Sequence, residues 1–448
     1  MKLIDVLCNL PTSLSGIVLC DWLELESVVF LDSAICTSYQ RPMLLDLFQS
    51  QEFVLKDLNL EEVGHLQWMF KRNIKVLELI VFAEITDSCT ASKYLQKFGC
   101  FVRSVQVAGC SAHDVYLLVA HCRFLTTLTV FTVESMLPVR ELLRCNPNLQ
   151  EVRFYSFSTD QVALFAKDTY SQIKTLHIED CLGTQKFPWH AFTGPALESL
   201  TLLSLQWLAG TDITALTQRC SNLRWINTTD TNLTDQQLCL LAESCQLLTH
   251  FDITNNSLVT DSGILSVVRK LPLLRHIEIH DCDRLTELSL EHIQVHCASR
   301  LTGLAVDIPS SNALAAFMRL VQSCKMFVHA DVHAPPNTFS LNELEVCIAT
   351  MSNVRSMALF GDFLTDAALC LVGKYCARLE RLNICNDRLN LSYAPLALMN
   401  GCPKLKLVLV KNVEDISLCT INMWKYLRPQ LRFSTGVNSD TFLQLSTM

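Results

Sequence analysis

Three short segments of the sequence alternate histidine with carboxylate residues, side chains that can ligate metal ions or transfer protons. The segments are His250-x-Asp252, His276-x-Glu278-x-His280 and His329-x-Asp331-x-His333. In a β-strand, residues two positions apart lie on one face, so each segment would present its polar groups together. A metal site, a general acid–base site and a polar surface that binds another protein all use such groups.

These three kinds of site differ in what else they require. A metal site needs ligands that converge and are held by further contacts, whereas side chains on flat neighbouring strands should splay apart. Acid–base catalysis needs a nucleophile or a substrate pocket, and the sequence has no Walker loop, Ser-His-Asp arrangement or kinase motif. The sequence therefore favours a polar protein-binding surface, with no catalytic residue, no metal and no cofactor.

The element that must position these side chains is clearest in residues 220–245, a 26-residue segment bounded by two cysteines. Its apolar spacing, which includes Leu223 and Ile226, predicts a short strand, and a polar turn follows. Thr234 can cap a helix that continues with apolar residues at helical spacing, and Gln237 can complete its capping box. One such unit cannot bury its own apolar face, so it requires stacked neighbours.

Copies of this unit recur along most of the chain. Counted by the first apolar residue of each strand, they begin at Leu55, Ile74, Val102, Leu125, Leu149, Ile173, Leu197, Leu223, Leu248, Leu274, Leu301, Phe327, Val354, Leu379, Leu405 and Leu431. From Ile74 onward the steps are 23 to 28 residues long, which is the signature of leucine-rich repeats. We therefore predict a strongly curved α/β solenoid, or horseshoe, with a parallel inner sheet of about fifteen strands and an outer wall of helices.

Each outer helix should begin at a recurring threonine–aspartate pair. The pairs occupy residues 86–87, 159–160, 211–212, 234–235, 260–261 and 365–366. Threonine and aspartate at these places can accept hydrogen bonds from the unpaired amides of the first helical turn. These aspartates are therefore predicted to cap helices and not to catalyse.

The composition fits one long repeat array. Half of the 448 residues are hydrophobic, 18% are charged, and the net charge is −8. The sequence shows no basic stripe, so we expect no nucleic acid as partner, and the acidic balance favours protein partners. The apolar run from Ile17 to Cys20 is too short for a signal peptide or a membrane span, so we expect neither a targeting segment nor a membrane partner.

The 21 cysteines fall at repeat positions. Those expected at helix ends or after strands are Cys100, Cys110, Cys122, Cys145, Cys181, Cys220, Cys245, Cys282, Cys297, Cys376, Cys385 and Cys402. Cysteine packs as a small apolar side chain, and we find no C-x-x-C pair with zinc spacing. We predict structural thiols in a reducing compartment, the cytoplasm or the nucleus.

Residues 1–50 do not follow the repeat and are predicted to form two or three short amphipathic helices. A Leu-Pro pair that opens such a module directly before cysteine-containing leucine-rich repeats resembles the F-box/leucine-rich-repeat family. Members of that family are substrate receptors of cullin–RING ubiquitin ligases, and their F-box binds the Skp adaptor. The resemblance implies an adaptor-binding surface made of Leu10, Pro11, Leu14, Ile17 and Trp22. Where the family has an arginine–tryptophan pair near the end of the module, this sequence has Tyr39 and Arg41.

Side chains between the strand leucines should face the inner, concave surface. Those predicted to bind a target protein there are Arg153, Tyr155, His177, Glu179, Trp225, Asn227, His250, Asp252, His276, Glu278 and His280. Because adjacent strands lie about 4.8 Å apart, we expect His250 beside His276 and Asp252 beside Glu278. Tyr155 and Trp225 would be aromatic anchors of the kind that dominate interface energetics.

Two functions remain open from the sequence. In the first, residues 1–50 bind a Skp-type adaptor and the repeats of residues 51–448 select a target protein for an SCF-type ubiquitin ligase. In the second, residues 1–50 only cap the open end of the solenoid, and the protein is a stand-alone scaffold or inhibitor. Neither function requires catalysis.

Overall fold

The structure of the protein is a computed structural model that describes most of the chain. The described residues are 19–20, 25–35, 39–50, 53–158, 161, 163–181, 187–205, 213, 216, 218–335, 339–361, 363–385, 394–411 and 432–434. They belong to two compact units, the first holding residues 1–207 and 218–220 and the second holding residues 208–217 and 221–448. Each unit is described separately.

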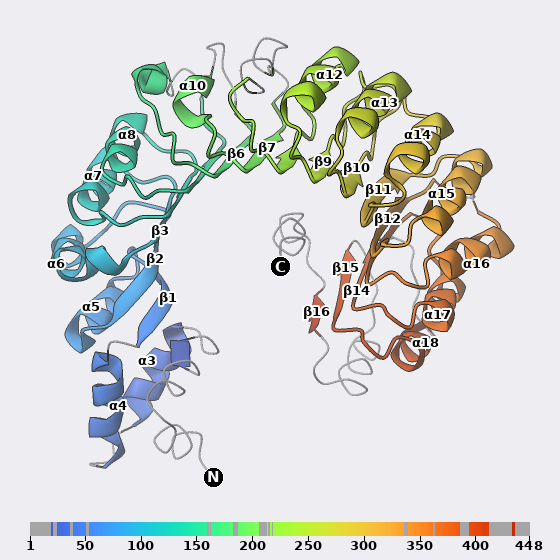
Figure 1. Cartoon of the computed structure of the whole chain (residues 1–448). Coiled ribbons are helices and arrows are strands. Elements are labelled where there is room, and N and C mark those ends of the chain that lie inside the picture. The colour runs from blue at the N-terminus through green and yellow to red at the C-terminus, as the bar shows by residue number, and fades with distance from the viewer. Residues whose placement is uncertain are drawn as a thin grey trace. The chain divides into compact units, whose positions relative to one another are not determined.

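The first unit pairs its strands in parallel and in chain order, with the helices on one side of the sheet (Figure 1). The strands are β1 (Val54–Asn59), β2 (Lys75–Val81), β3 (Ser104–Val107), β4 (Thr127–Val130), β5 (Glu151–Tyr155), β6 (Thr175–Glu179) and β7 (Ser199–Leu203). The helices are α3 (Leu25–Ala34), α4 (Gln40–Gln49), α5 (Val63–Arg72), α6 (Ser88–Phe98), η1 (Gly99–Phe101), α7 (Ala112–His121), α8 (Met136–Arg144), η2 (Ala163–Lys167) and α10 (Trp189–Phe192).

The second unit repeats the same arrangement. Its strands are β8 (Trp225–Asn227), β9 (His250–Asp252), β10 (His276–Glu278), β11 (Gly303–Asp307), β12 (His329–His333), β13 (Ser356–Phe360), β14 (Arg381–Cys385), β15 (Leu407–Lys411) and β16 (Arg432–Ser434). Its helices are α12 (Asp235–Ser244), α13 (Asp261–Lys270), α14 (Glu287–Cys297), α15 (Ser311–Ser323), α16 (Leu341–Thr350), α17 (Asp366–Tyr375) and α18 (Ala394–Gly401).

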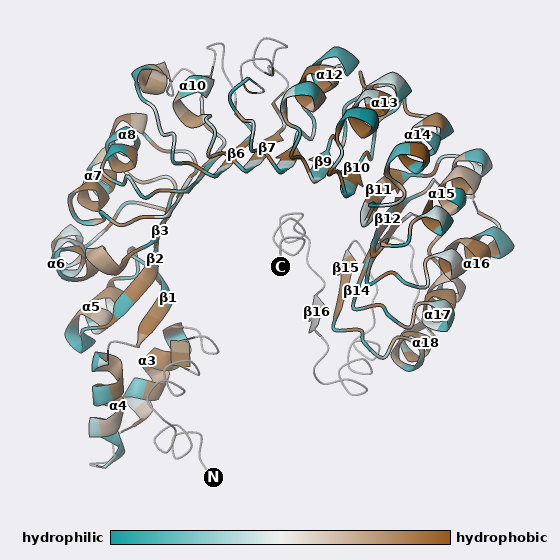
Figure 2. Ribbon diagram, viewed as in Figure 1, coloured by the Kyte–Doolittle hydropathy of each residue, from teal (hydrophilic) through white to brown (hydrophobic). Residues whose placement is uncertain are grey.

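The predicted leucine-rich-repeat solenoid is confirmed. Each strand begins close to the apolar residue that marked its repeat, and residues such as Leu223, Ile226 and Leu238 are buried between sheet and helices. The helices are amphipathic, and Figure 2 shows hydrophobic and hydrophilic residues on different sides of them. We call the opposite face of each sheet, which no helix of the described repeats covers, the helix-free face.

A recurring polar turn ends the strands. Residues in the left-handed region of backbone space follow at regular steps, among them Ser156, Asp180, Ser204, Asn255 and Asp281. The Ser156 amide donates to the Glu179 carbonyl of the next repeat (3.0 Å), and the Asn255 amide donates to His280 in the same way (2.9 Å). Small polar residues tolerate this conformation better than branched ones, which explains why the turns are polar.

The predicted helix caps are found where the pairs are described, and they also join repeats. Thr260 caps α13 and Thr365 caps α17, while Gln237 accepts the Thr234 amide (2.7 Å) as the capping box requires. The Asp235 carboxylate accepts both the amide (2.9 Å) and the hydroxyl (2.6 Å) of Thr260 in the next repeat. At α6 the cap is Asp87 and not Thr86, and residues 159–160 and 211–212 lie outside the described part.

The cysteines behave largely as structural thiols. Those described in the structure form no disulfide, and most of the predicted ones are buried, although Cys100 is exposed. Burial raises the pKa of the Cys122 thiol to about 12, so it is an unreactive thiol at neutral pH. Cys297 donates to the Val268 carbonyl of the preceding repeat (3.9 Å).

The N-terminal module is described in part. Helices α3 and α4 confirm its helical character, but the proposed adaptor residues Leu10, Pro11, Leu14, Ile17 and Trp22 lie outside the described residues. Asp32 of α3 is buried and ties the module to the first repeat. Its carboxylate contacts Arg41 (2.8 Å) and accepts hydrogen bonds from Trp68 (2.7 Å) and Arg72 (3.1 Å) of α5.

A buried carboxylate also joins two repeats in the first unit. Asp168 is buried and accepts hydrogen bonds from Arg140 (2.6 Å), Arg144 (2.7 Å) and Tyr170 (3.1 Å). The hydrogen bond from Arg140, followed by that from Arg144, outweighs burial and lowers the pKa of Asp168 to about 2. The ionised carboxylate is therefore the form that stabilises the fold.

We predict that Asp168→Asn lowers stability at neutral pH and that this loss disappears in acid. The folded pKa lies below the value of about 3.9 for aspartate in an unfolded chain, so the contribution of ionised Asp168 is complete above pH 4 and lost as the pH falls toward 2. Urea unfolding of both proteins between pH 7 and pH 2.5 would measure it. A constant difference at every pH would contradict the prediction.

Candidate functional site

The second unit places the predicted side chains in rows on its helix-free face. In the first row, Trp225 pairs with His250 and His250 pairs with His276. In the second row, two residues further along the same strands, Asn227 pairs with Asp252 and Asp252 pairs with Glu278. The expected neighbours His250–His276 and Asp252–Glu278 are therefore confirmed. The alternating residues Ile226, Phe251 and Ile277 point the other way and are buried, so the rows are fixed by the core packing of the same strands.

The first row is aromatic. The Trp225 and His250 rings stack with centroids 4.4 Å apart, His250 lies 5.4 Å from His276, and His276 lies 6.1 Å from His329. Burial lowers the pKa of His250 to about 4, and it lowers the pKa of His329 to about 4 as well. Both rings are therefore neutral at physiological pH, and the row is a partly exposed aromatic surface.

Gly303 of β11 makes this row possible. It lies between His276 on β10 and His329 on β12. A Cβ atom at this position would overlap the His276 Nδ1 atom and lie 3.1 Å from the His329 Cβ atom. The glycine therefore provides the space that the His276 ring occupies.

The second row carries the carboxylates. Asp252 accepts hydrogen bonds from the Asn227 side chain (2.6 Å) and the Thr254 amide (2.9 Å), and Glu278 pairs with His276 (2.9 Å). Burial and the neighbouring charge of Glu278 raise the pKa of Asp252. Burial alone would raise the pKa of Glu278, but the hydrogen bond and charge of His276 hold it below its usual value. Of the two carboxylates, Glu278 is the one that carries the charge.

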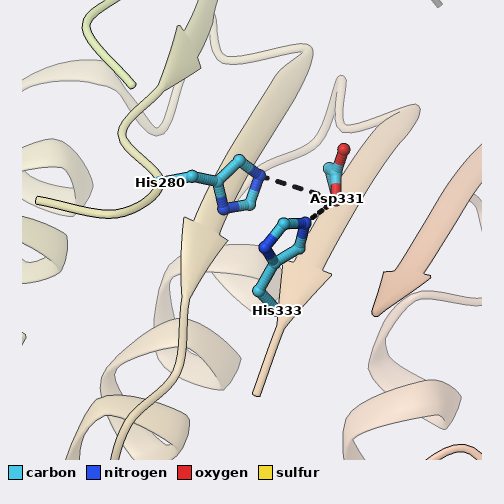
Figure 3. Close-up of side chains that lie close together, drawn as sticks. All are labelled: His280, Asp331 and His333. Carbon is cyan, nitrogen blue, oxygen red and sulfur yellow. Dashed lines mark ion pairs between the residues drawn. The ribbon is translucent and has the colours of Figure 1, made fainter. Parts of the chain in front are cut away.

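At the other end of the strands, two histidines meet two carboxylates, and Figure 3 shows His280 and His333 with one of these carboxylates, Asp331. The rings of His280 and His333 stack with centroids 3.9 Å apart. Asp307 lies 3.2 Å from His280 Nδ1, and Asp331 lies 3.5 Å from His280 Nε2. Burial lowers the pKa of His280, but the hydrogen bond with Asp307 and the nearby carboxylate of Asp331 outweigh it and raise the pKa to about 10.

The predicted residues of the first unit form a smaller patch on its own helix-free face. Tyr155 stacks on His177 on one side (4.7 Å) and on Phe131 on the other (4.7 Å). His177 pairs with Glu179 (2.9 Å), as His276 pairs with Glu278 in the second unit. Arg153 donates to Glu151 of the same strand (2.7 Å).

Sequence reasoning missed two contributors to these surfaces. Phe131 stacks on Tyr155 and precedes it in the sequence by one repeat. Asp307 was not among the predicted site residues, yet it pairs with His333 in the sheet and follows His280 by 27 residues, one repeat length. The constant period was thus the signal that could have placed it, and the expectation that side chains would splay does not hold for His280, Asp331 and His333.

The fold and this surface define a leucine-rich-repeat solenoid, a class that is typically a binding scaffold. No family model matches the chain. The curated proteins include a relative, the antagonist of mitotic exit network protein 1 of Candida glabrata, that is 23% identical over 181 residues. That match covers 39% of this chain and only 30% of the relative, so the chain spans less than a third of the relative's length.

A solved structure extends the likeness in fold to nearly the whole chain. It is the crystal structure of the Rad7 and Elc1 complex in yeast, in which one chain matches with a TM-score of 0.51 and 12% sequence identity. The match covers 98% of this chain and 93% of that chain. Within the described residues, no helix has both the length and the apolar character needed to cross a bilayer.

We predict that Gly303→Ala destabilises the second unit by about 1–3 kcal/mol, the usual cost of overpacking. Alanine normally suits a strand better than glycine, so the loss must come from the overlap with His276. Urea unfolding would measure it, and adding His276→Ala in the same chain should restore most of the stability. Equal loss in the single and double variants would show that the His276 ring is not the cause.

Proposed function

We propose that the protein is a non-enzymatic substrate receptor of an SCF-type ubiquitin ligase that works in the cytoplasm or nucleus. In this proposal residues 1–50 bind a Skp-type adaptor, and the repeats of residues 51–448 bind a target protein on their helix-free face. The thiol state of the described cysteines fits a reducing compartment.

The observation that carries the proposal is the aromatic row of Trp225, His250 and His276. These rings lie in register on three adjacent strands and remain partly exposed. The core does not use them, since the same strands bury Ile226 and Ile277 on the opposite face. A rigid aromatic row beside a charged carboxylate provides both the apolar contact and the polar specificity of a protein interface.

The solved structure with the same fold supports a partner-binding role. That structure is of a complex of two proteins, Rad7 and Elc1. In this chain, two aromatic rings of the N-terminal module are exposed, Phe30 at 72% and Tyr39 at 74%. Aromatic residues are enriched at protein interfaces, and both rings lie within residues 1–50, the module proposed to bind the adaptor.

The alternative function, a stand-alone scaffold or inhibitor, has its own support. Asp32 binds α3 firmly to Arg41, Trp68 and Arg72, which is how a cap would be attached to the first repeat. The curated relative is named an antagonist. Direct measurement of adaptor binding separates the two functions.

We predict that purified full-length protein binds a purified Skp adaptor in a pull-down and that Leu10→Ala/Leu14→Ala/Ile17→Ala/Trp22→Ala abolishes this binding. A matched control, Leu137→Ala/Leu288→Ala/Leu341→Ala, removes exposed leucines of the helices α8, α14 and α16. It should bind the adaptor as the wild type does. Thermal unfolding checks that each variant is folded. Absence of adaptor binding by folded wild-type protein would establish the alternative function.

A second set of variants tests whether the helix-free face binds the target protein. The target protein should be enriched by quantitative pull-down with the wild type and no longer enriched when Trp225, His250 and His276 are replaced by alanine together. The control replaces Tyr116, His292 and His296, rings on the helical side of the repeats, and should keep it. If every partner identified with the wild type also binds the triple variant of Trp225, His250 and His276, the helix-free face does not select the target protein.

A further inference from the structure

The strand β11 separates two strands of matching pattern on the helix-free face of the second unit. β10 and its extension carry His276, Glu278 and His280, and β12 carries His329, Asp331 and His333. Between them, β11 offers Gly303, Ala305 and Asp307 in register. Strands two places apart are separated by about 9.6 Å, so the stacked rings of His280 and His333 must both extend over β11, where Asp307 is in register with His333.

Three ligand atoms converge over this strand. One atom each of His280, Asp331 and His333 lies within 4.8 Å of the others, and this is the one such group among the residues that the structure describes. Asp331 Oδ1 lies 3.5 Å from His280 Nε2 and 3.6 Å from His333 Nε2. Tetrahedral zinc with bonds of about 2.0–2.2 Å places its ligand atoms roughly 3.3–3.6 Å apart, so the two distances from Asp331 Oδ1 to the histidine nitrogens fit a metal coordination shell.

The same atoms lack hydrogen-bond partners. His280 Nε2 and Asp331 Oδ1 are both buried and both unpaired, and the His280 residue is only 6% exposed. Their separation of 3.5 Å exceeds a well-formed hydrogen bond, which is about 2.7–3.2 Å long. Buried polar atoms without partners are costly, and a cation between them would satisfy both.

The other nitrogen of each ring faces Asp307. His280 Nδ1 lies 3.2 Å and His333 Nδ1 lies 3.6 Å from the same oxygen, Asp307 Oδ1. Metal-ligating histidines commonly donate their second ring N–H to a carboxylate, which fixes the ring and its tautomer. Asp307 stands in that position for both rings, and it also accepts the Asp281 amide, which holds the carboxylate in place.

We propose that His280, Asp331 and His333 bind a zinc ion through His280 Nε2, His333 Nε2 and an Asp331 oxygen, with Asp307 orienting the two rings. Two imidazoles and one carboxylate form a donor set that favours zinc over magnesium or calcium. The side chains of Asp331 and His333 are 23% and 31% exposed, so the fourth position is accessible to a water molecule. The proposal is independent of adaptor binding and of the target protein.

The competing interpretation is a cluster of ion pairs without metal. In it, a proton on His280 is shared between Asp307 and Asp331, and the two carboxylates stabilise it. A metal ion would replace that proton, so zinc binding and the ion-pair cluster are distinguished by measuring binding directly.

The test uses full-length protein freed of metal with a chelator and then titrated with Zn²⁺ by calorimetry. We expect one equivalent to bind and to raise the thermal unfolding temperature. Co²⁺ should give the visible spectrum of a tetrahedral site with nitrogen and oxygen ligands and without the near-ultraviolet band of a cobalt–thiolate bond, which distinguishes this site from the cysteines.

Three variants and a matched control locate the ion. Asp331→Asn and His333→Ala should abolish binding of the equivalent, while Asp307→Asn should weaken it by roughly 10–100-fold, as the loss of an outer partner does. The control His276→Ala/His329→Ala removes two histidines of the same strands and face and should bind Zn²⁺ as the wild type does. Absence of stoichiometric binding by the folded wild type, or binding that survives Asp331→Asn and His333→Ala, would overturn the proposal.

Discussion

The stacking of one repeat on the next is the interaction on which the whole structure depends. A single repeat leaves a strand edge unpaired and an apolar face exposed, and only its neighbour can satisfy both. The neighbour also supplies the polar contacts of the turns. Asn256 is fully buried, and its side chain donates to the carbonyls of Thr228 (2.7 Å) and Ile253 (2.9 Å) and accepts the Leu233 amide (2.8 Å). Stability is therefore distributed over the interfaces between repeats.

The same constraint builds the functional surface. Because each unit holds its strands in constant register, residues one repeat apart in sequence become lateral neighbours, as Trp225, His250 and His276 do. The face is then differentiated by side-chain size. Gly303 on β11 leaves the space that the His276 ring occupies, so a residue without a side chain determines where a larger neighbour can lie.

Much of the backbone and little of the side-chain geometry could be predicted from the sequence. Apolar spacing located the strands and their buried residues, and threonine–aspartate pairs located several caps, because both signals are local. The same pairs did not reveal that Asp235 also binds Thr260 of the next repeat, since this contact depends on the pitch of the stack. Convergence of His280 and His333 was missed for a related reason: it depends on the side-chain rotamers of residues whose strands are not adjacent.

The helix-free face of the second unit thus has two ends with different physical character. Near the start of its strands, His250 and His329 are neutral rings held in an aromatic row. Near the end, Asp307 and Asp331 create a local negative field that stabilises positive charge at the buried His280. An aromatic row tolerates many partners, whereas buried charges demand a specific counterpart. Affinity for a protein partner should therefore arise mainly at the first end, and chemical selectivity at the second.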